Sequence, residues 1–244
     1  MKKMIFCGLI STLLLFTSCV EWSFSRKMKP SENVVEKEMK MTPFDKVSLD
    51  AMGHVKIVQS QGNDYRVVLS APDNYMDLFE FKVDDGEMEM DFADGTVGDI
   101  EVKDVMVTIY TPRLIEVENE GLCTLTIDSL KSRLLKVENS GVGAMKLHGL
   151  NVEKIAVDCS GVGGIKLEGK AHWANIECSG VGAVDAGKLK ARRVKADVSG
   201  VGGLECYASD SLKASVSGVG ALKYGGKPKV KKLDESGVGK ISEL

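Results

Sequence analysis

Residues 137–169 read VENSGVGAMKLHGLNVEKIAVDCSGVGGIKLEG, and this stretch decides the fold because it contains one pattern twice. The tetrapeptide Ser-Gly-Val-Gly begins at Ser140 and again at Ser160. Along the whole chain it occurs six times, at intervals of 18 to 20 residues. A period near 20 residues is typical of a solenoid, in which each repeat forms one coil stacked on the previous one. The copies begin at Ser140, Ser160, Ser179, Ser199, Ser217 and Ser236, after a degenerate copy at Glu120.

The residues between these tetrapeptides alternate between apolar and polar, which indicates strands. Ile155, Val157 and Cys159 precede the second copy at a spacing of two, and Ile165 and Leu167 resume that spacing after it. A period of two gives each strand one buried face. We therefore predict an all-β solenoid whose coils each hold two short strands, a Gly-Val-Gly corner and a variable return turn. Neighbouring coils would pair as parallel strands about 4.8 Å apart.

The glycines and the valine of each corner have a physical role in such a stack. A turn between two strands favours φ angles that a Cβ hinders, and stacked corners leave little lateral room. A phosphate-binding loop needs a helix after its glycines, and a strand follows here, so the pattern does not predict a phosphate site. We expect the valines between the glycines to stack as a column. They are Val142, Val162, Val181, Val201, Val219 and Val238.

The last repeat departs from the pattern in its charges. Lys231, Glu235 and Glu243 stand where other coils carry apolar or neutral residues. The terminal coil of a solenoid exposes one face and must be protected against edge-to-edge pairing. We therefore predict that these three residues form a cap.

The region before the repeats also has strand patterns, although it lacks the tetrapeptide. Asp84-Asp85-Gly86 between two alternating runs predicts a hairpin, and residues 72–78 could hold a short helical turn. We expect a less regular β region over 44–113 and the solenoid repeats over 114–244. The expected strands of the earlier region lie near 47–49, 55–59, 65–70, 79–83, 88–92 and 105–111.

The first residues have the pattern of a lipoprotein export signal. Two lysines precede an apolar run over residues 4–16, which is too short to span a bilayer. Residues 16–19, Phe-Thr-Ser-Cys, resemble the lipobox of bacterial lipoproteins, with Phe where Leu is usual. We predict a signal peptide over 1–18, a lipid anchor on Cys19 and a tether over 19–43. The alternative is an ordinary signal peptide that ends near a cysteine by chance.

Composition and charge limit the classes of function. The formal net charge is −3, and removal of the signal peptide leaves 30 basic and 35 acidic residues. A mildly acidic chain without a basic stripe binds nucleic acid poorly, so we expect no nucleic-acid partner. Aromatic residues make up only 6% of the chain, and the 26 glycines suit a repetitive β architecture.

Residues that could carry chemistry are few. The chain lacks His-Glu-x-x-His and Gly-x-Ser-x-Gly, so the sequence predicts no catalytic residues and no cofactor. Cys159 and Cys178 share the inward position of adjacent coils. Parallel in-register neighbours rarely reach disulfide geometry, so we favour buried thiols, while a disulfide in an oxidising envelope stays open. None of Cys123, Cys159, Cys178 and Cys206 lies in a CxxC pair.

An acidic residue stands two positions before most corner serines. Such a column would form a ladder of carboxylates about 5 Å apart on one outer face, and like charges at that distance repel each other. We favour a face balanced by the lysines four positions before the serines, and the alternative is binding of a divalent cation such as Ca²⁺. The candidate metal ligands are Glu138, Asp158, Glu177 and Asp197, and the lysines are Lys136, Lys195, Lys213 and Lys232.

Residues 44–62, FDKVSLDAMGHVKIVQSQG, together with the later Gly-Val-Gly coils, resemble the GIN-domain family. Phe44-Asp45-Lys46-Val47, Gly53 and Gln59-Ser60-Gln61-Gly62 carry the resemblance, which extends over about 44–240. Members of this family are described as auto-transporter adhesin heads and are common as Bacteroidetes-type lipoproteins. The resemblance implies a right-handed parallel β-helix-like fold and supplies no catalytic residues.

These observations favour a non-enzymatic outer-membrane lipoprotein of the cell envelope. Its regular surface suits an adhesin or a scaffold that binds a glycan or a protein partner, and a lipid anchor would attach it to the membrane. One alternative is a polysaccharide-active enzyme on a β-helix, similar to pectate lyases, which would need a basic residue and a groove beside the acids. Another is a periplasmic partner in envelope maintenance or sensing, since the sequence leaves the leaflet undecided.

Overall fold

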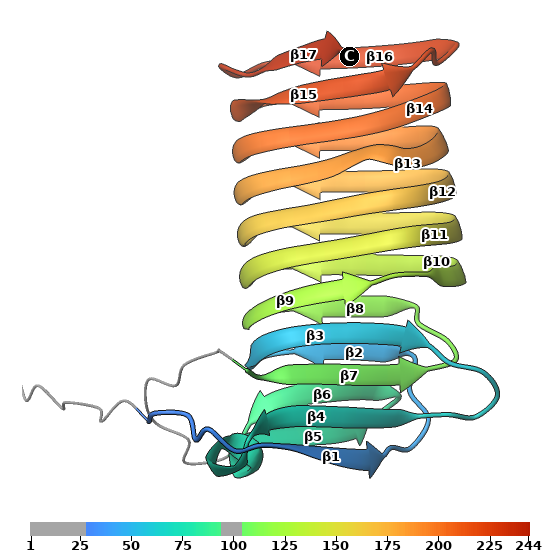
Figure 1. Ribbon diagram of the computed structural model, residues 1–244. Helices are drawn as coiled ribbons and strands as arrows, with labels where there is room; N and C mark the ends of the chain where they lie inside the picture. Colours follow the sequence, from blue (N-terminus) through green and yellow to red (C-terminus); the bar gives the residue numbers. More distant parts are fainter. Residues whose placement is uncertain (1–27, 94–103) are drawn as a thin grey trace, which may run out of the picture.

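The computed structural model describes residues 28–93 and 104–244 and confirms the all-β solenoid. Its strands pair into one sheet that winds into stacked coils (Figure 1). No helix of the described residues is long and apolar enough to cross a membrane. The first part contains β1 (Val34–Lys40), β2 (Lys46–Leu49), β3 (Met52–Gln59), β4 (Arg66–Pro72), the 3-10 helix η1 (Asp73–Leu78), β5 (Phe79–Asp84), β6 (Glu87–Phe92) and β7 (Met106–Thr111). The repeats contain β8 (Glu116–Asn119), β9 (Leu122–Ile127), β10 (Leu130–Asn139), β11 (Val142–Cys159), β12 (Val162–Cys178), β13 (Val181–Val198), β14 (Val201–Val216), β15 (Val219–Gly226), β16 (Val230–Glu235) and β17 (Lys240–Glu243).

The coils pair in parallel and in the register that the repeat predicts. Val142 pairs with Val162, and the column continues through Val181 and Val201 to Val219. These valines lie at the corners along the left edge of Figure 1, and they are about half exposed. The corner valines therefore stack as a column, as predicted.

The return turn is more regular than the sequence suggested. Each strand from β11 to β14 runs from one Gly-Val-Gly corner through the return turn to the next corner. A register shift between Leu147 and Leu150 marks the bend in β11, and Leu150 and Val152 are buried there. The turn therefore forms a third short face of the coil, because its apolar side chains reach the core.

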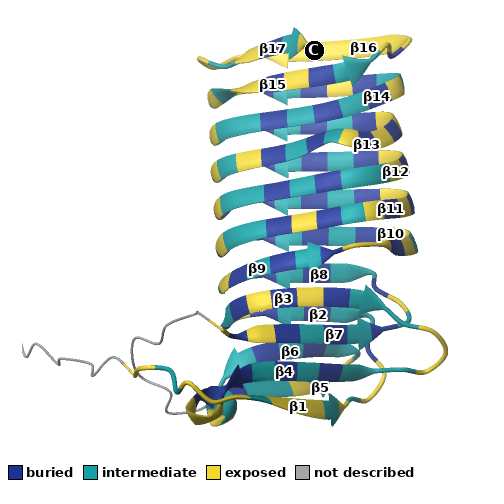
Figure 2. Ribbon diagram, viewed as in Figure 1, coloured by how far each residue is buried: buried dark blue, intermediate teal, exposed yellow. Residues whose placement is uncertain are grey.

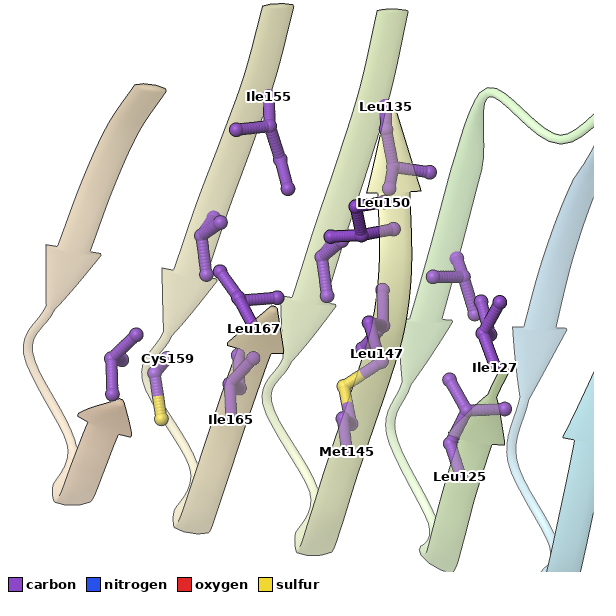
Figure 3. Close-up of a cluster of buried hydrophobic side chains, with 14 of the residues drawn as sticks. Leu125, Ile127, Leu135, Met145, Leu147, Leu150, Ile155, Cys159, Ile165 and Leu167 are labelled. Atoms are coloured by element: carbon purple, nitrogen blue, oxygen red, sulfur yellow. The ribbon is translucent and has the colours of Figure 1, made fainter. Parts of the chain in front are cut away.

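The predicted inward residues form one continuous core. Ile155, Val157, Cys159, Ile165 and Leu167 are each 2% exposed or less. Figure 3 shows Ile155, Ile165 and Leu167 pointing into the interior beside their counterparts from neighbouring coils. Full burial of an aliphatic side chain contributes about 1.5–3 kcal/mol, so each coil is stabilised mainly by these contacts.

The corner glycines are required chiefly because stacked backbones approach closely. A Cβ on Gly161 or Gly180 would overlap carbonyl oxygens of the preceding corner, and a Cβ on Gly182 would overlap the oxygen of Gly163. Positive φ is rarer than the sequence suggested: among the Gly-Val-Gly corners only Gly143 (+152°) and Gly163 (+137°) have it. Lateral crowding is thus the common cause.

The less regular β region over 44–113 precedes the repeats, as predicted, and its strands continue the same stack. β2 pairs in parallel with β6 and β8, and β3 pairs in parallel with β7 and β9. The unit β2–β3 is therefore a coil inserted between two coils that come later in the sequence (Figure 1). The predicted hairpin at Asp84-Asp85-Gly86 joins β5 to β6, and η1 occupies the predicted helical turn.

A strand lies within the stretch that we expected to be a tether. β1 pairs antiparallel with β4, and its side chains are exposed or half-buried. The strand β1 was not predicted because its lysines and glutamates interrupt the alternation of apolar residues that would indicate a buried face. On an edge strand such charges protect against pairing with other chains. The predicted signal peptide and Cys19 lie outside the described residues.

Charged residues close the other end of the solenoid, as predicted. Lys231 and Glu235 occupy the positions that pair with Leu212 and Val216 of the preceding coil. The carboxylate of Glu235 accepts a hydrogen bond from the amide of Ile241 at 2.6 Å. All residues of β16 are exposed (Figure 2), so the last coil offers little apolar surface to a further coil.

Candidate functional site

The acidic ladder exists on one outer face of the solenoid. Glu118 pairs with Glu138, and the column continues in register through Asp158 and Glu177 to Asp197. Neighbouring strands lie about 4.8 Å apart, so these carboxylates are close enough to repel each other. The column begins in β8 and ends in β13 on the face formed by the strands that precede each corner.

Lysines balance this ladder at two of the predicted positions. Lys136 Nζ lies 2.7 Å from Glu116 and 2.9 Å from Glu138. Lys195 Nζ lies 2.8 Å from Asp197. The predicted compensation by lysine is therefore present at both ends of the ladder.

Asp158 lies in the part of the ladder where no lysine stands beside it. Its coil carries Ala156 at the position that is Lys136 in the preceding coil. Burial, with Glu138 and Glu177 on either side, raises the pKa of Asp158. In the described part of the chain, its Oδ1 atom is buried without a hydrogen-bond partner. The charge of Asp158 therefore destabilises the folded state.

We expect Asp158→Asn to raise the free energy of unfolding at pH 7 by about 0.5–1 kcal/mol. Because the pKa is raised on folding, the folded protein holds the Asp158 proton more tightly than the unfolded chain does. The charge therefore costs stability above the raised pKa, and that cost disappears as the pH falls through this pKa to the ordinary aspartate value, about 3.9. Urea unfolding of both proteins at several pH values measures this difference.

Asp197→Asn is the matched control, and its effect should have the opposite sign. Burial acts to raise the pKa of Asp197, but hydrogen bonds from Lys195 and Ser215 outweigh burial and lower it. Removing this charge should therefore destabilise the protein at neutral pH and have no effect at pH values below the lowered pKa. Effects of equal sign at Asp158 and Asp197 would contradict this account of the ladder.

One group of carboxylates in the described residues is close enough to hold a metal ion. Glu116, Glu118 and Glu138 each offer an oxygen, and these atoms lie within 4.8 Å of one another. The ammonium group of Lys136 already bridges two of the three carboxylates. This geometry favours the lysine-balanced face. Cation binding by Glu138, Asp158, Glu177 and Asp197 stays a prediction, and Glu138 alone of these four belongs to the group.

The four cysteines of the described residues are buried free thiols. Cys159 pairs with Cys178 in the next coil, as the repeat predicts. The hydrogen bond that the Cys159 thiol donates to this neighbour, together with burial, raises the pKa of Cys159. Burial raises the pKa of Cys123 and Cys206 to about 12. The thiols therefore serve as small core residues.

The return corners form a shallow groove that the sequence analysis missed. Lys154, Trp173 and Arg193 stack in register on β11, β12 and β13. Together with His172 and Arg192 they line a hollow of about 490 Å³. The exposed fraction of Trp173 is 41%, and its backbone pairs with the strands of both neighbouring coils.

The groove continues along the solenoid axis toward the N-terminal coils. A second hollow of about 450 Å³ shares His172 with the first and is also lined by Lys131 and Arg133. A third hollow of about 640 Å³ shares these two cations and reaches Gln59. These return corners stack along the right edge of Figure 2. We define the return-corner groove by Arg113, Lys131, Arg133, Lys154, His172, Trp173, Arg192 and Arg193.

The return-corner groove carries an excess of positive charge. Glu153 is the acidic residue of its lining. The ion pairs at the groove are Arg113–Asp45, Arg133–Glu153 and Arg193–Asp210, at 3.3, 3.9 and 3.6 Å. Among the described residues no ion pair involves Lys131, Lys154 or Arg192.

This groove corrects the view that the chain lacks a basic stripe. Its cations lie about one coil apart in the sequence, and only the stacking of the coils brings them together. A usable signal was present: Lys154, Trp173 and Arg193 each lie six positions before a corner serine. Aligning the repeats on their serines would have placed the three side chains in one column.

Comparison with known proteins agrees with this fold. A family model described as "Putative auto-transporter adhesin, head GIN domain" matches residues 43–228. The crystal structure of a putative adhesin from Bacteroides fragilis is 32% identical, with a TM-score of 0.85 over 89% of this chain and 100% of that one. A putative adhesin from Parabacteroides merdae is 20% identical, with a TM-score of 0.64 over 89% of this chain and 99% of the other.

A third solved structure has the same fold under a different description. It is a putative lipid binding protein from Parabacteroides distasonis, 17% identical, with a TM-score of 0.68 over 90% of this chain and 100% of that one. No curated protein matches the chain. The family description and the name of the Bacteroides fragilis protein point to an adhesin-like role at the cell envelope. Because the family model covers most of its length, the chain belongs to the family described as "Putative auto-transporter adhesin, head GIN domain".

Proposed function

We propose that this protein is a lipid-anchored binding module of the outer membrane, which presents its solenoid to a polymer outside the cell. The observation that carries the proposal is the in-register parallel pairing of the strands on both sides of each corner from β8 to β15, with the register shifts confined to the return turns, so that equivalent positions of successive coils line up along one axis. A rod of this kind suits contact with an extended partner, since a repeating ligand can meet equivalent positions in successive coils.

The proposed attachment combines the lipobox-like residues with the shape of the fold. Residues 16–19 supply the cysteine for lipidation, and acyl chains can hold a protein at a membrane without a helix that spans it. The chain enters the fold at β1, beside β4, at the end of the stack opposite to β16 and β17 (Figure 1). An anchor at that end would leave the repeats directed away from the membrane.

Proteinase K treatment of intact cells tests the surface location. We expect the protein to disappear from an immunoblot while a periplasmic lipoprotein in the same cells survives. The control shows that the outer membrane stayed closed. Protection of the protein until the outer membrane is broken would overturn the surface location and favour a periplasmic role.

Substitution of Cys19 tests the anchor. We expect Cys19→Ser to move the protein from the membrane fraction to the soluble fraction and to abolish labelling by a radioactive fatty acid, because the thiol is the acceptor of the lipid. Cys7→Ser is a matched control, since this cysteine lies within the predicted signal peptide. Continued labelling of the Cys19 variant would contradict lipidation at this residue.

A further inference from the structure

We propose that the return-corner groove binds an acidic polysaccharide, with Trp173 stacked on a sugar ring and the surrounding cations paired with its carboxylate or sulfate groups. This inference rests on the proposed role as a polymer-binding module and names the class of ligand. It concerns a face of the solenoid different from the acidic ladder.

The first argument is the concentration of unpaired positive charge in a protein that is acidic overall. The chain has a formal net charge of −3, yet the groove contains six lysine and arginine side chains and one acidic residue in its lining. Cations that lack an internal partner gain most from an anionic ligand, because no ion pair must be broken on binding. Lys131, Lys154 and Arg192 are the cations of this kind.

The second argument is the exposed indole between cations. Trp173 stands between Lys154 and Arg193 in register, so an aromatic face and positive charges alternate at a spacing of about 4.8 Å. A large rigid aromatic side chain supplies contact area at a low cost in conformational entropy. A flat ring of this kind can lie against the apolar face of a pyranose while the neighbouring cations reach its charged substituents.

The third argument is the shape of the groove. Three hollows share lining residues in sequence, His172 between the first two and Lys131 with Arg133 between the second and third. The groove therefore extends along the solenoid axis over several coils, which suits a linear chain. A membrane surface would favour a convex apolar ridge. A single-stranded nucleic acid would favour several stacked aromatic residues, and the groove lining has one.

Fluorescence of Trp173 measures binding directly. The chain contains two tryptophans, Trp22 and Trp173, so the full chain with Trp22→Phe has a single reporter in the groove. Polygalacturonate offers carboxylates, heparin offers sulfates as well, and dextran is the neutral control. We expect at least one acidic polymer to change the fluorescence in a saturable way at low ionic strength, with affinity that falls as salt is added. If both acidic polymers bind, negative charge in general is recognised. If only one binds, its particular charged groups are recognised.

Variants test whether the groove itself is responsible, with affinity measured by calorimetry. We expect Trp173→Ala, and separately Lys154→Gln with Arg192→Gln, to weaken binding at least tenfold, while Trp173→Phe retains most of it. The matched control is Lys213→Gln with Lys232→Gln, which removes two exposed lysines that continue the Lys195 column beside the acidic ladder and lie outside the groove lining, and it should leave the affinity unchanged. Unchanged urea midpoints show that each variant is folded.

Several outcomes would overturn the proposal. They are failure of both acidic polymers to bind at low ionic strength, equal weakening by the control pair, and preference for single-stranded DNA. Binding only to vesicles of phosphatidylglycerol and phosphatidylcholine would assign the groove to a membrane instead. Because these experiments use purified protein in solution, their failure is distinct from that of the protease test, which concerns location alone.

Discussion

Gly202→Ala is expected to destabilise the protein by more than about 4 kcal/mol, or to prevent its folding. A Cβ at this position would overlap the carbonyl oxygen of Gly182, and it would lie 2.8 Å from the carbonyl carbon of the same residue. Both atoms belong to the backbone of the neighbouring coil, so no side-chain rotation can relieve the overlap. The corner would have to separate from the corner below it, which breaks the pairing of β13 with β14.

The adjacent glycine provides a close control for this prediction. A Cβ on Gly203 would meet the oxygen of Ala221 at 3.8 Å, which is an ordinary contact, and alanine occupies the same position in the coils of Ala183 and Ala221. Gly203→Ala should therefore leave the unfolding free energy within about 0.5 kcal/mol of the wild-type value. Urea unfolding followed by circular dichroism measures both variants. Similar midpoints for the two would contradict the role assigned to corner crowding.

The repeats could be predicted well from the sequence because each coil contains a tetrapeptide that defines its alignment with the next coil. Six tetrapeptides fixed the corners, and the alternation around them identified the buried face, as Ile155 and Ile165 illustrate. The same feature explains what was missed. Asp50-Ala51-Met52-Gly53 occupies a corner without matching the tetrapeptide, so the β2–β3 coil was not recognised as a member of the stack. Its insertion between later coils depends on contacts distant in the sequence, which periodicity does not specify.

The candidate site divides in the same way. The acidic ladder was predictable because an acidic residue holds the same position in successive coils from β8 to β13, whereas the groove residues Lys154, Trp173 and Arg193 differ in type from coil to coil. A column of unlike side chains produces no repeated motif in the sequence. The residues of the proposed groove therefore come from positions at which the repeats differ, while the positions at which the repeats agree form the core and the corners.

Asn139→Leu is expected to destabilise the protein by about 2 kcal/mol. Asn119 and Asn139 are fully buried, and Asn119 Nδ2 donates a hydrogen bond to Asn139 Oδ1 at 2.7 Å. The substitution leaves the amide of Asn119 in the core without its partner, and the Oδ1 atom of Asn119 already lacks one within the described residues. An unsatisfied buried polar group costs about 1–3 kcal/mol. Urea unfolding of the single variants and the double variant measures the coupling.

The double variant Asn119→Leu, Asn139→Leu should recover most of the loss, because replacing both partners by apolar groups of similar shape removes the unsatisfied amide. Leu49 already occupies the same inward column one coil below, so the site accepts leucine. The sum of the single effects should exceed the effect of the double substitution by about 1 kcal/mol or more. Additive effects would show that the two amides do not interact.

A polar pair that is not needed for stability can still specify which coils become neighbours. The repeats are alike in pattern, so hydrophobic alternation discriminates poorly between the coil of β8 and the other coils as a partner for β10. Any arrangement that separates Asn119 from Asn139 leaves two buried amides unpaired, which costs about 1–3 kcal/mol for each. We therefore expect the double leucine variant to refold with additional slow phases although its equilibrium stability is close to wild type. A single refolding phase at the wild-type rate would show that Asn119 and Asn139 do not determine which coils pair during folding.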